Sequence, residues 1–258
     1  MIHHLKRSII ILGKEQASYP VFLHIRNATT TVDKLYEDHI PTNFIQKSFL
    51  SVGSALTSIT DPRRHDAIAV LGETTGYYAL KNIYNQMLKD SEGGKIIADK
   101  PRINSKTVDI NKLAAMPHDS LGHSYWQFLS VNEVTPDSRL PVRFVDNQEL
   151  AYVMQRYREV HDLFHTILGM PTNMLGEVAV KWIEATQTGL PMCISGALFG
   201  PLRFRPKQRA TYINKLLPWT LRTCRNAKPL MTIYFERRWD QNIQDLRNEL
   251  NIETPPKI

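Results

Sequence analysis

The sequence predicts an all-α fold, a single multi-helix domain in which an antiparallel pair of helices carries a metal site. Helical periodicity dominates the chain, whereas strand-like patterns are confined to two short stretches, residues 142–145 and 231–235. A hydrophobic fraction of 42% is ordinary for a globular protein, and 258 residues suffice for one large domain. Neither an internal repeat nor a low-complexity linker divides the chain, so we expect residues 29–258 to form one helical domain.

Several stretches combine a helical pattern of apolar residues with end signals such as Gly, Pro or a capping residue. They cover residues 41–58, 63–89, 117–130, 147–168, 173–188, 206–222 and 240–250. Pro218 falls inside one of them, where we expect a bend. Residues 90–110, which include Gly93 and Gly94, are expected to form a long loop.

The helix expected over residues 147–168 carries two histidines on its apolar face. Asp146 is its predicted N-cap, and Glu149 completes a capping box. His161 and His165 lie one turn apart, about 40° round the helix axis. Both imidazoles therefore point into the interior, along the stripe formed by Leu150, Met154, Tyr157 and Leu168.

A second helix, expected over residues 173–188, brings a carboxylate towards the histidines. The connection before it is short, with Thr172 as the predicted N-cap, and such a connection favours an antiparallel pair. Glu177 comes twelve positions after His165, about one turn into the second helix. We expect the two side chains to face each other, because Gly176 permits close approach of the helices.

The resulting pattern, H-D-x-x-H-x(11)-E, is typical of a metal centre. Two imidazoles and a carboxylate suit zinc, iron or cobalt, and three or four protein ligands with an open position are typical of a catalytic site. Asp162 lies at the edge of the histidine stripe and can reach the same ion or orient a ligand. Taken singly these residues have structural explanations, since Glu177 can pair with Lys181 and Asp162 with Arg158. Their combination favours a metal site.

Residues 1–28 differ in composition from the rest of the chain. They hold four basic residues against a single acid, Glu15, with serines between them. This composition is typical of a mitochondrial import segment, and an ordinary N-terminal helix is the alternative. We therefore expect residues 1–28 to be a targeting segment.

Positive charge is concentrated between Glu184 and Glu236, where no acidic residue occurs. Basic residues there, among them Arg203, Arg205 and Arg209, are interleaved with bulky apolar ones. This mixture suits an anionic membrane surface. No apolar run reaches the length of a membrane span, so any attachment is expected to be peripheral. Nucleic acid is not an expected partner, because no recognition motif accompanies the charge.

Several longer blocks occur in collinear order over roughly residues 40–256, including LGETTG, RFVDNQELAYV, HDLFHTILGMPTNMLGE, KWIEATQTGLPMC, FGPLRF and YFERRWDQ. Together they resemble the coenzyme Q (ubiquinone) biosynthesis protein 4 family. The resemblance implies an all-helical protein that lies peripherally on the matrix side of the mitochondrial inner membrane. It also implies two kinds of partner, the other proteins of the coenzyme Q biosynthetic complex and a polyprenylated aromatic lipid.

The resemblance further implies a site and a reaction. The family's metal residues map onto His161, Asp162, His165 and Glu177, and the implied metal is zinc. The implied activity is that of a metal-dependent carboxy-lyase, which removes the C1 carboxylate from a polyprenylated 4-hydroxy-3-methoxybenzoate. Two histidines and a carboxylate also resemble oxygen-activating iron sites, and with such a metal a hydroxyl can replace the carboxylate oxidatively. Asp162 is then the candidate for proton transfer or ligand orientation, and Arg158 for binding the substrate carboxylate.

Other functions stay open at this point. A non-catalytic, lipid-binding scaffold would organise the coenzyme Q biosynthetic complex, and its metal would be structural. A metalloprotease is a weaker alternative, because its motif needs Glu next to the first histidine, where this chain has Asp162. A phosphohydrolase with a His-Asp pair usually needs further, separated ligands.

Overall fold

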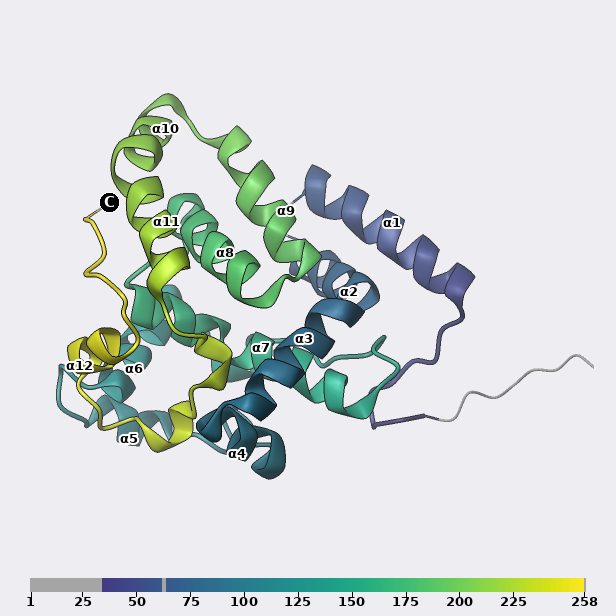
Figure 1. Ribbon diagram of the computed structural model, residues 1–258, viewed down its shortest axis with the longest axis horizontal. Helices are drawn as coiled ribbons and strands as arrows, with labels where there is room; N and C mark the ends of the chain where they lie inside the picture. The colour runs from purple at the N-terminus through teal and green to yellow at the C-terminus, as the bar shows by residue number, and fades with distance from the viewer. Residues whose placement is uncertain (1–33, 62–63, 258) are drawn as a thin grey trace, which may run out of the picture. The chain divides into compact units, whose positions relative to one another are not determined.

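The protein is described from a computed structural model, which places residues 34–61 and 64–257, all within one compact unit, Asp33–Ile258. Those residues are predominantly helical and contain no β-strand, only an isolated bridge between Ser120 and Asn242 (Figure 1). The predicted all-α class is therefore confirmed. The predicted targeting segment, residues 1–28, lies outside the described residues.

The helices carry the labels of Figure 1. The α-helices are α1 Phe44–Thr60, α2 His65–Thr75, α3 Tyr77–Lys89, α4 Ser91–Asp99, α5 Ile110–Ala114, α6 Leu121–Asn132, α7 Gln148–Leu168, α8 Met174–Thr188, α9 Pro191–Phe199, α10 Pro206–Thr211, α11 Leu217–Asn226 and α12 Ile243–Glu249. Short 3-10 turns lie at Pro136–Ser138, Gly200–Arg203, Leu230–Thr232 and Phe235–Arg237.

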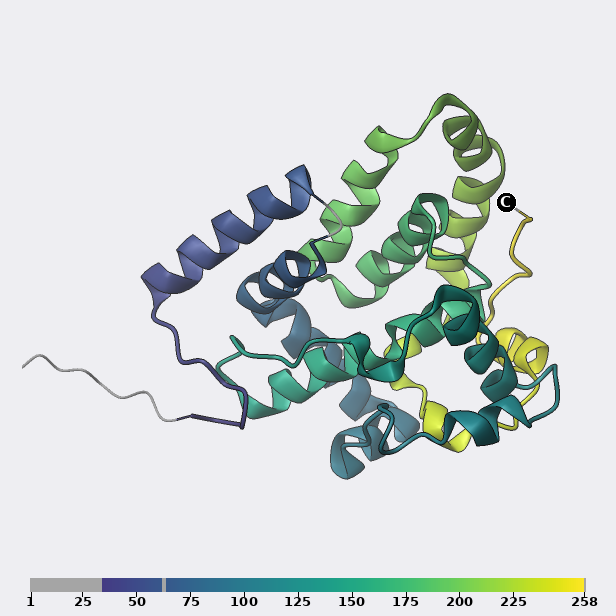
Figure 2. The ribbon, with the colours of Figure 1, turned by 180° about the vertical axis from the view of Figure 1, so that it is seen from behind.

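Helix α7 is the central element of the unit. It packs against α3, α6, α8 and α12 (Figures 1 and 2). All its residues except Gln148, Glu149 and Tyr152 are buried. Apolar side chains alone do not account for this burial, because α7 also buries several charged residues. Charges removed from water must be paired, so each needs a partner from another element.

The helix expected over residues 63–89 is two helices, because the chain turns at Gly76. This residue is both the C-cap of α2 and the N-cap of α3. A Cβ atom at Gly76 would lie 2.4 Å from the carbonyl oxygen of Gly72 and 3.1 Å from the side chain of Leu190. Only glycine fits this turn, which lets α2 pack against α9 while α3 packs against α7.

The loop expected over residues 90–110 was a wrong prediction, because it contains α4 and the start of α5. Asp90 caps α4 by accepting hydrogen bonds from the N–H groups of Glu92 and Gly93. Gly93 suggests a loop from sequence alone, but here it serves packing. A Cβ atom on Gly93 would lie 2.6 Å from the carbonyl oxygen of Met87.

The two strand-like stretches are not strands. Residues 231–235 run from one short 3-10 turn, Leu230–Thr232, to the next, Phe235–Arg237. In residues 142–145, the N–H groups of Arg143 and Phe144 donate to the buried carboxylate of Glu73, at 2.7 and 2.6 Å. A single carboxylate thus takes the place of a neighbouring strand.

Other local predictions are displaced by a few residues. Asn147, not Asp146, caps α7, and Asn173, not Thr172, caps α8. The helix expected over residues 206–222 is interrupted by a π-helical turn, Tyr212–Leu216. Pro218 lies in the first turn of α11, directly after this π-helical turn, and the bend expected there stays a prediction.

The α7–α8 connection generates a stability prediction at Gly176. A Cβ atom there would lie 2.0 Å from the carbonyl oxygen of Pro171, a backbone atom that cannot rotate away. We expect Gly176→Ala to lower the free energy of unfolding by roughly 1–3 kcal/mol, measured by denaturant titration. Gly53→Ala is the matched control, because no atom of the described residues lies within 4 Å of a Cβ at this position in α1. Gly53→Ala should raise the free energy of unfolding by up to about 1 kcal/mol. Similar effects of the two substitutions would show that close packing at Gly176 is not required.

Candidate metal centre

A tight turn joins the two helices that carry the predicted metal ligands. Helix α7 ends at Gly169, whose φ of 61° is in the left-handed region that glycine favours. The N–H of Met170 then donates to the carbonyl of His165 at 2.9 Å. Asn173 starts α8 by accepting from the N–H groups of the next turn. This geometry sets Glu177 in the first turn of α8, close to the end of α7.

The turn brings His161, His165 and Glu177 together. Each offers one ligand atom, and these atoms all lie within 4.8 Å of one another. His165 Nε2 and Glu177 Oε1 are 3.4 Å apart. Both histidines are buried, whereas 35% of the Glu177 side-chain surface is exposed to solvent. The three residues are therefore accessible from the α8 side. We call these three residues the triad.

Each histidine of the triad is oriented by a hydrogen bond at Nδ1. His161 Nδ1 lies 2.6 Å from Glu184 Oε1, and His165 Nδ1 lies 3.0 Å from the carbonyl oxygen of Met170. Because both acceptors require a proton on Nδ1, each Nε2 keeps its lone pair for another partner. His165 Nε2 is buried and finds no hydrogen-bond partner among the residues that the structure describes. Metal-binding histidines in proteins are typically oriented in this way.

Glu184 is itself held by a buried network. Its carboxylate accepts from Lys181 at 2.6 Å and from the Tyr157 hydroxyl at 2.9 Å. Burial disfavours its ionised form, but Lys181 and His161 outweigh burial and hold the pKa of Glu184 well below its usual value. Burial raises the pKa of the adjacent Cys193 thiol to about 12, so this cysteine stays neutral. The network therefore keeps an anion behind His161.

The electrostatics of the triad favour a cation. Burial opposes ionisation of Glu177, but His165 and the other nearby positive groups outweigh it and hold the Glu177 pKa at about 2. Burial, assisted by Lys181, lowers the pKa of His161, which favours the neutral, ligating form. Burial also opposes the charge of His165, but Glu177 outweighs it and raises the pKa of His165. A positive charge beside the Glu177 carboxylate is thus stabilised.

The donor set fits a transition-metal ion. It consists of two imidazole nitrogens and one carboxylate oxygen, the combination that suits zinc, iron or cobalt. The buried Nε2 of His165, which makes no hydrogen bond within residues 34–61 and 64–257, is an atom that a metal would satisfy. Three protein ligands leave at least one coordination position for water or substrate, which is the arrangement of catalytic rather than structural zinc sites.

Asp162, also a predicted ligand, is not among the residues whose ligand atoms converge. Its carboxylate is buried and accepts a hydrogen bond from Nη2 of Arg139. Arg139 lies in the loop before α7. One position after His161 on a helix, Asp162 is turned by about 100° away from the histidine side chain. Its neighbourhood is therefore close to the triad but separate from it.

Arg158 is also placed away from the triad. Its guanidinium donates to Glu73 Oε1 at 2.5 Å and to the carbonyl oxygens of Ala69 and Leu140, each at 3.0 Å. The pair with Asp162 that helical spacing suggests is not formed. Binding of a substrate carboxylate by Arg158 stays a prediction, but three acceptors already engage this side chain.

Two residues of the site, Glu184 and Arg139, are not predicted from the sequence. Glu184 follows Glu177 by seven positions, two turns along the same face of α8, so its spacing is a usable signal. Arg139 is brought in from a loop and has no local signal. Both matter because they determine how His161 and Asp162 are oriented.

The basic residues predicted to face a membrane are exposed. Arg203, Arg205 and Arg209 lie at the start of α10 and just before it, and Arg203 donates to the carbonyl of Ile59 at the end of α1. Helix α1 buries only Ser54 and exposes an apolar stripe. The stripe consists of Phe44, Ile45, Phe49, Val52, Leu56 and Ile59. In the described part of the chain, no helix is long and apolar enough to cross a membrane.

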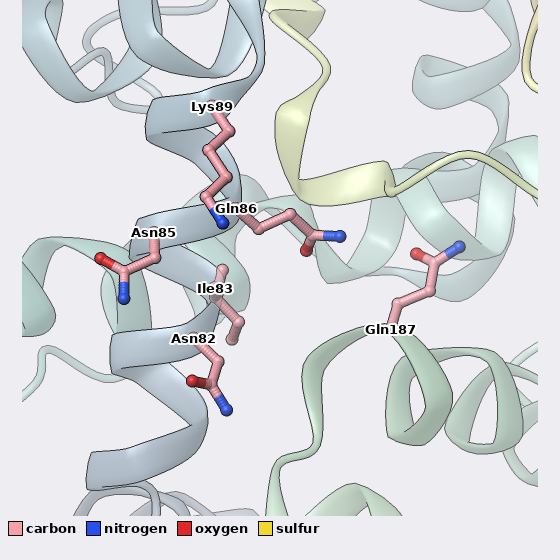
Figure 3. A pocket seen from close by; sticks show the side chains of 6 residues that line it. All are labelled: Asn82, Ile83, Asn85, Gln86, Lys89 and Gln187. Carbon is pink, nitrogen blue, oxygen red and sulfur yellow. The ribbon is translucent and has the colours of Figure 1, made fainter.

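One cavity of the unit lies away from the triad. It has a volume of about 420 Å³ and lies between α3 and the end of α8 (Figure 3). Amide side chains dominate its walls, with Gln86 and Gln187 facing each other. Gln187 is already bonded to the backbone of Lys228 and Leu230. The cavity offers no acid or histidine among its lining residues, so we assign it no chemistry.

Comparison with known proteins gives consistent matches over most of the chain. The family model described as "Coenzyme Q (ubiquinone) biosynthesis protein Coq4" matches residues 36–256. The chain is 56% identical to "Ubiquinone biosynthesis protein COQ4 homolog, mitochondrial" of Mus musculus, over 86% of this chain and 84% of the relative. The protein of the same name from Homo sapiens is 53% identical, with the same two coverages of 86% and 84%.

A solved structure shares the fold. The crystal structure of a "Putative ubiquinone biosynthesis protein" from Nostoc punctiforme aligns with a TM-score of 0.64, over 83% of this chain and 100% of that chain. Sequence identity in this alignment is 17%, so the likeness concerns the fold alone.

The orientation of His161 by Glu184 generates a prediction on metal affinity. Glu184→Gln removes the anionic acceptor behind His161 and should lower metal affinity by about 10–100-fold, measured by competition with a chromogenic chelator. Glu253→Gln is the control, because Glu253 forms a surface pair with Arg222. Undiminished affinity in the Glu184 variant would contradict the orienting role.

Proposed function

The chain belongs to the coenzyme Q (ubiquinone) biosynthesis protein Coq4 family, and we propose that it removes the C1 carboxylate from a polyprenylated 4-hydroxy-3-methoxybenzoate at a metal centre. Membership of the family assigns it to ubiquinone biosynthesis. The reaction, the metal and the residues are our proposal, and the convergence of His161, His165 and Glu177 is the observation that carries it.

The chemistry of the substrate suits such a site. In a 4-hydroxybenzoate the hydroxyl group is para to C1, so its oxygen makes C1 electron-rich. Addition of a proton at C1 gives a dienone-like intermediate, and breaking the bond from C1 to the carboxylate then releases carbon dioxide and restores the aromatic ring. The enzyme must therefore orient the carboxylate, deliver a proton to C1 and keep the ring in place.

The triad and its supporting residues would supply this environment. His161, His165 and Glu177 would hold the metal, with Glu184 and the Met170 carbonyl orienting the two imidazoles. A bound zinc would act as a Lewis acid or acidify a bound water. Iron, with dioxygen as the oxidant, would also allow the oxidative replacement of the carboxylate by hydroxyl. Asp162 stays a candidate for proton transfer or orientation, beside the triad rather than in it.

The substrate's polyprenyl tail requires access to a bilayer. We propose that the protein lies peripherally on the matrix side of the mitochondrial inner membrane, with the other proteins of the coenzyme Q biosynthetic complex. The apolar stripe of α1 and the cluster of Arg203, Arg205 and Arg209 support this, because apolar surface beside positive charge is what anionic lipid attracts. The relatives described above carry the word mitochondrial in their names.

A non-catalytic scaffold is the second candidate. The exposed stripe of α1 favours it, since a contiguous apolar surface also marks protein interfaces. In that case a metal between α7 and α8 would stabilise the helix pair, and its loss would disrupt the complex rather than the chemistry.

Substitution of a ligand separates the two candidates. We expect Glu177→Gln, at the exposed edge of the triad, to lower decarboxylation by more than about 100-fold while the complex still assembles. Carboxylated precursor should then accumulate, measured by mass spectrometry of lipid extracts. Collapse of the complex in this variant and in Asp162→Asn would instead favour the scaffold.

Charge reversal tests the membrane face. We expect the triple variant Arg203→Glu, Arg205→Glu and Arg209→Glu to bind anionic liposomes more weakly in flotation assays, because each reversal removes about 1 kcal/mol of attraction or more. Lys81→Glu, Lys95→Glu and Lys112→Glu make an equal change of charge on exposed residues of α3, α4 and α5. If both triple variants lose binding equally, net charge rather than this face is responsible.

A further inference from the structure

Arg139 lies in the loop before α7 and points towards the neighbourhood of the triad. Its Nη2 donates to Oδ1 of Asp162, the residue that follows His161 on α7. Glu177, the triad's carboxylate, is another of the charges that act on this guanidinium. Arg139 therefore lies within electrostatic reach of the metal ligands without being one of them.

The guanidinium of Arg139 has donors that the fold leaves unused. Of its five N–H bonds, one to Asp162 is engaged, and the buried Nε makes no hydrogen bond in the described part of the chain. The fully buried hydroxyl of Tyr125 likewise has no partner within residues 34–61 and 64–257. Asp162 and Arg139 are the two charges that act most strongly on this hydroxyl. Buried donors are normally satisfied, so these two point to a ligand that carries acceptors.

Arg139 also lines a cavity of about 140 Å³. The other charged residues of its wall are engaged, because Arg102 donates to Glu159 at 2.7 Å and Asp137 accepts from the N–H of Ser105 at 2.9 Å. The Arg139 side chain keeps 30% of its surface exposed. A ligand in this cavity can therefore reach the Arg139 guanidinium, which still has free N–H groups to donate.

We propose that Arg139 binds the carboxylate of the substrate and that Asp162 is a positioning residue that holds Arg139. The inference rests on the proposed function, because Arg139 would bind the same carboxylate that the proposed reaction removes. A guanidinium matches a planar carboxylate through two parallel hydrogen bonds. Pockets for whole ligands measure about 300–1,000 Å³, so this smaller cavity admits the carboxylate end, and the ring and tail must lie outside it.

The contrast with Arg158 supports the choice. Arg158 donates to Glu73 and to two backbone carbonyls, and only 7% of the residue is exposed. A substrate carboxylate at Arg158 would have to displace these contacts. At Arg139 the carboxylate would accept hydrogen bonds from N–H groups that have no acceptor among the described residues.

Binding of two ligands to the metal-loaded, full-length chain tests the proposal. One is 4-hydroxy-3-methoxybenzoate with a single short prenyl group, and the other is the matching phenol without the carboxyl group. We expect Arg139→Gln to weaken binding of the acid by about 10–100-fold and to leave binding of the phenol unchanged, measured by calorimetry. Asp162→Asn should shift the same acid-to-phenol ratio in the same direction, which a merely structural role would not do.

Matched variants keep the test decisive. The double variant Arg139→Gln/Asp162→Asn leaves no buried charge unpaired, so it guards against misfolding of the single variant and should show the same selective loss. Arg237→Gln is the control, because it removes another acid-paired arginine, on the surface beside Asp99, and should bind both ligands as the wild type does.

Two results would count against the inference in distinguishable ways. If the Arg139 variants bind the acid as tightly as the wild type, Arg139 does not bind the carboxylate, and the proposed reaction is unaffected by this result. If the wild-type chain itself fails to prefer the acid and releases no carbon dioxide from it, the proposed function fails and takes this inference with it.

Discussion

The register between α7 and α8 is the constraint on which the site depends. Glu177 reaches the histidines because α7 ends in the left-handed conformation at Gly169 and α8 begins at the Asn173 cap. Gly176, packed on the carbonyl of Pro171, keeps the turn tight. A shift of α8 by one residue would rotate the carboxylate by about 100° away from the imidazoles. A short, glycine-dependent turn therefore sets the geometry of the proposed metal site.

A second feature is the charge buried along α7. Arg156 binds Glu236, Arg158 binds Glu73, Glu159 accepts from Arg102, and Asp162 accepts from Arg139. Every partner comes from a different element, so these pairs tie α7 to the surrounding chain. Buried pairs add little net stability, but breaking one leaves an uncompensated charge and is costly. They therefore help to define the arrangement of the helices around the triad, and the Arg139 pair extends that arrangement to the proposed carboxylate site.

Local sequence patterns predict part of this site and fail where distant contacts decide. The spacing of His161 and His165 predicts a shared helix face, and the short turn before Glu177 predicts the third member of the triad. The structure brings all three together. Asp162 looks like a fourth member because it is adjacent in sequence, but its partner, Arg139, comes from a loop whose path no helical pattern reveals. Gly93 misleads for a similar reason, since contact with Met87 and not a loop explains it. Helical class follows from periodicity, whereas partners of buried charges follow from tertiary packing.

Anomalous X-ray scattering from crystals of the purified protein tests the central claim most directly. Data collected on either side of the absorption edge of the metal identified by fluorescence would locate any bound ion. We expect one strong anomalous peak, bound by Nε2 of His161, Nε2 of His165 and the carboxylate of Glu177. A fully ordered triad with no such peak after metal supplementation, or a peak bound by other residues, would contradict this expectation.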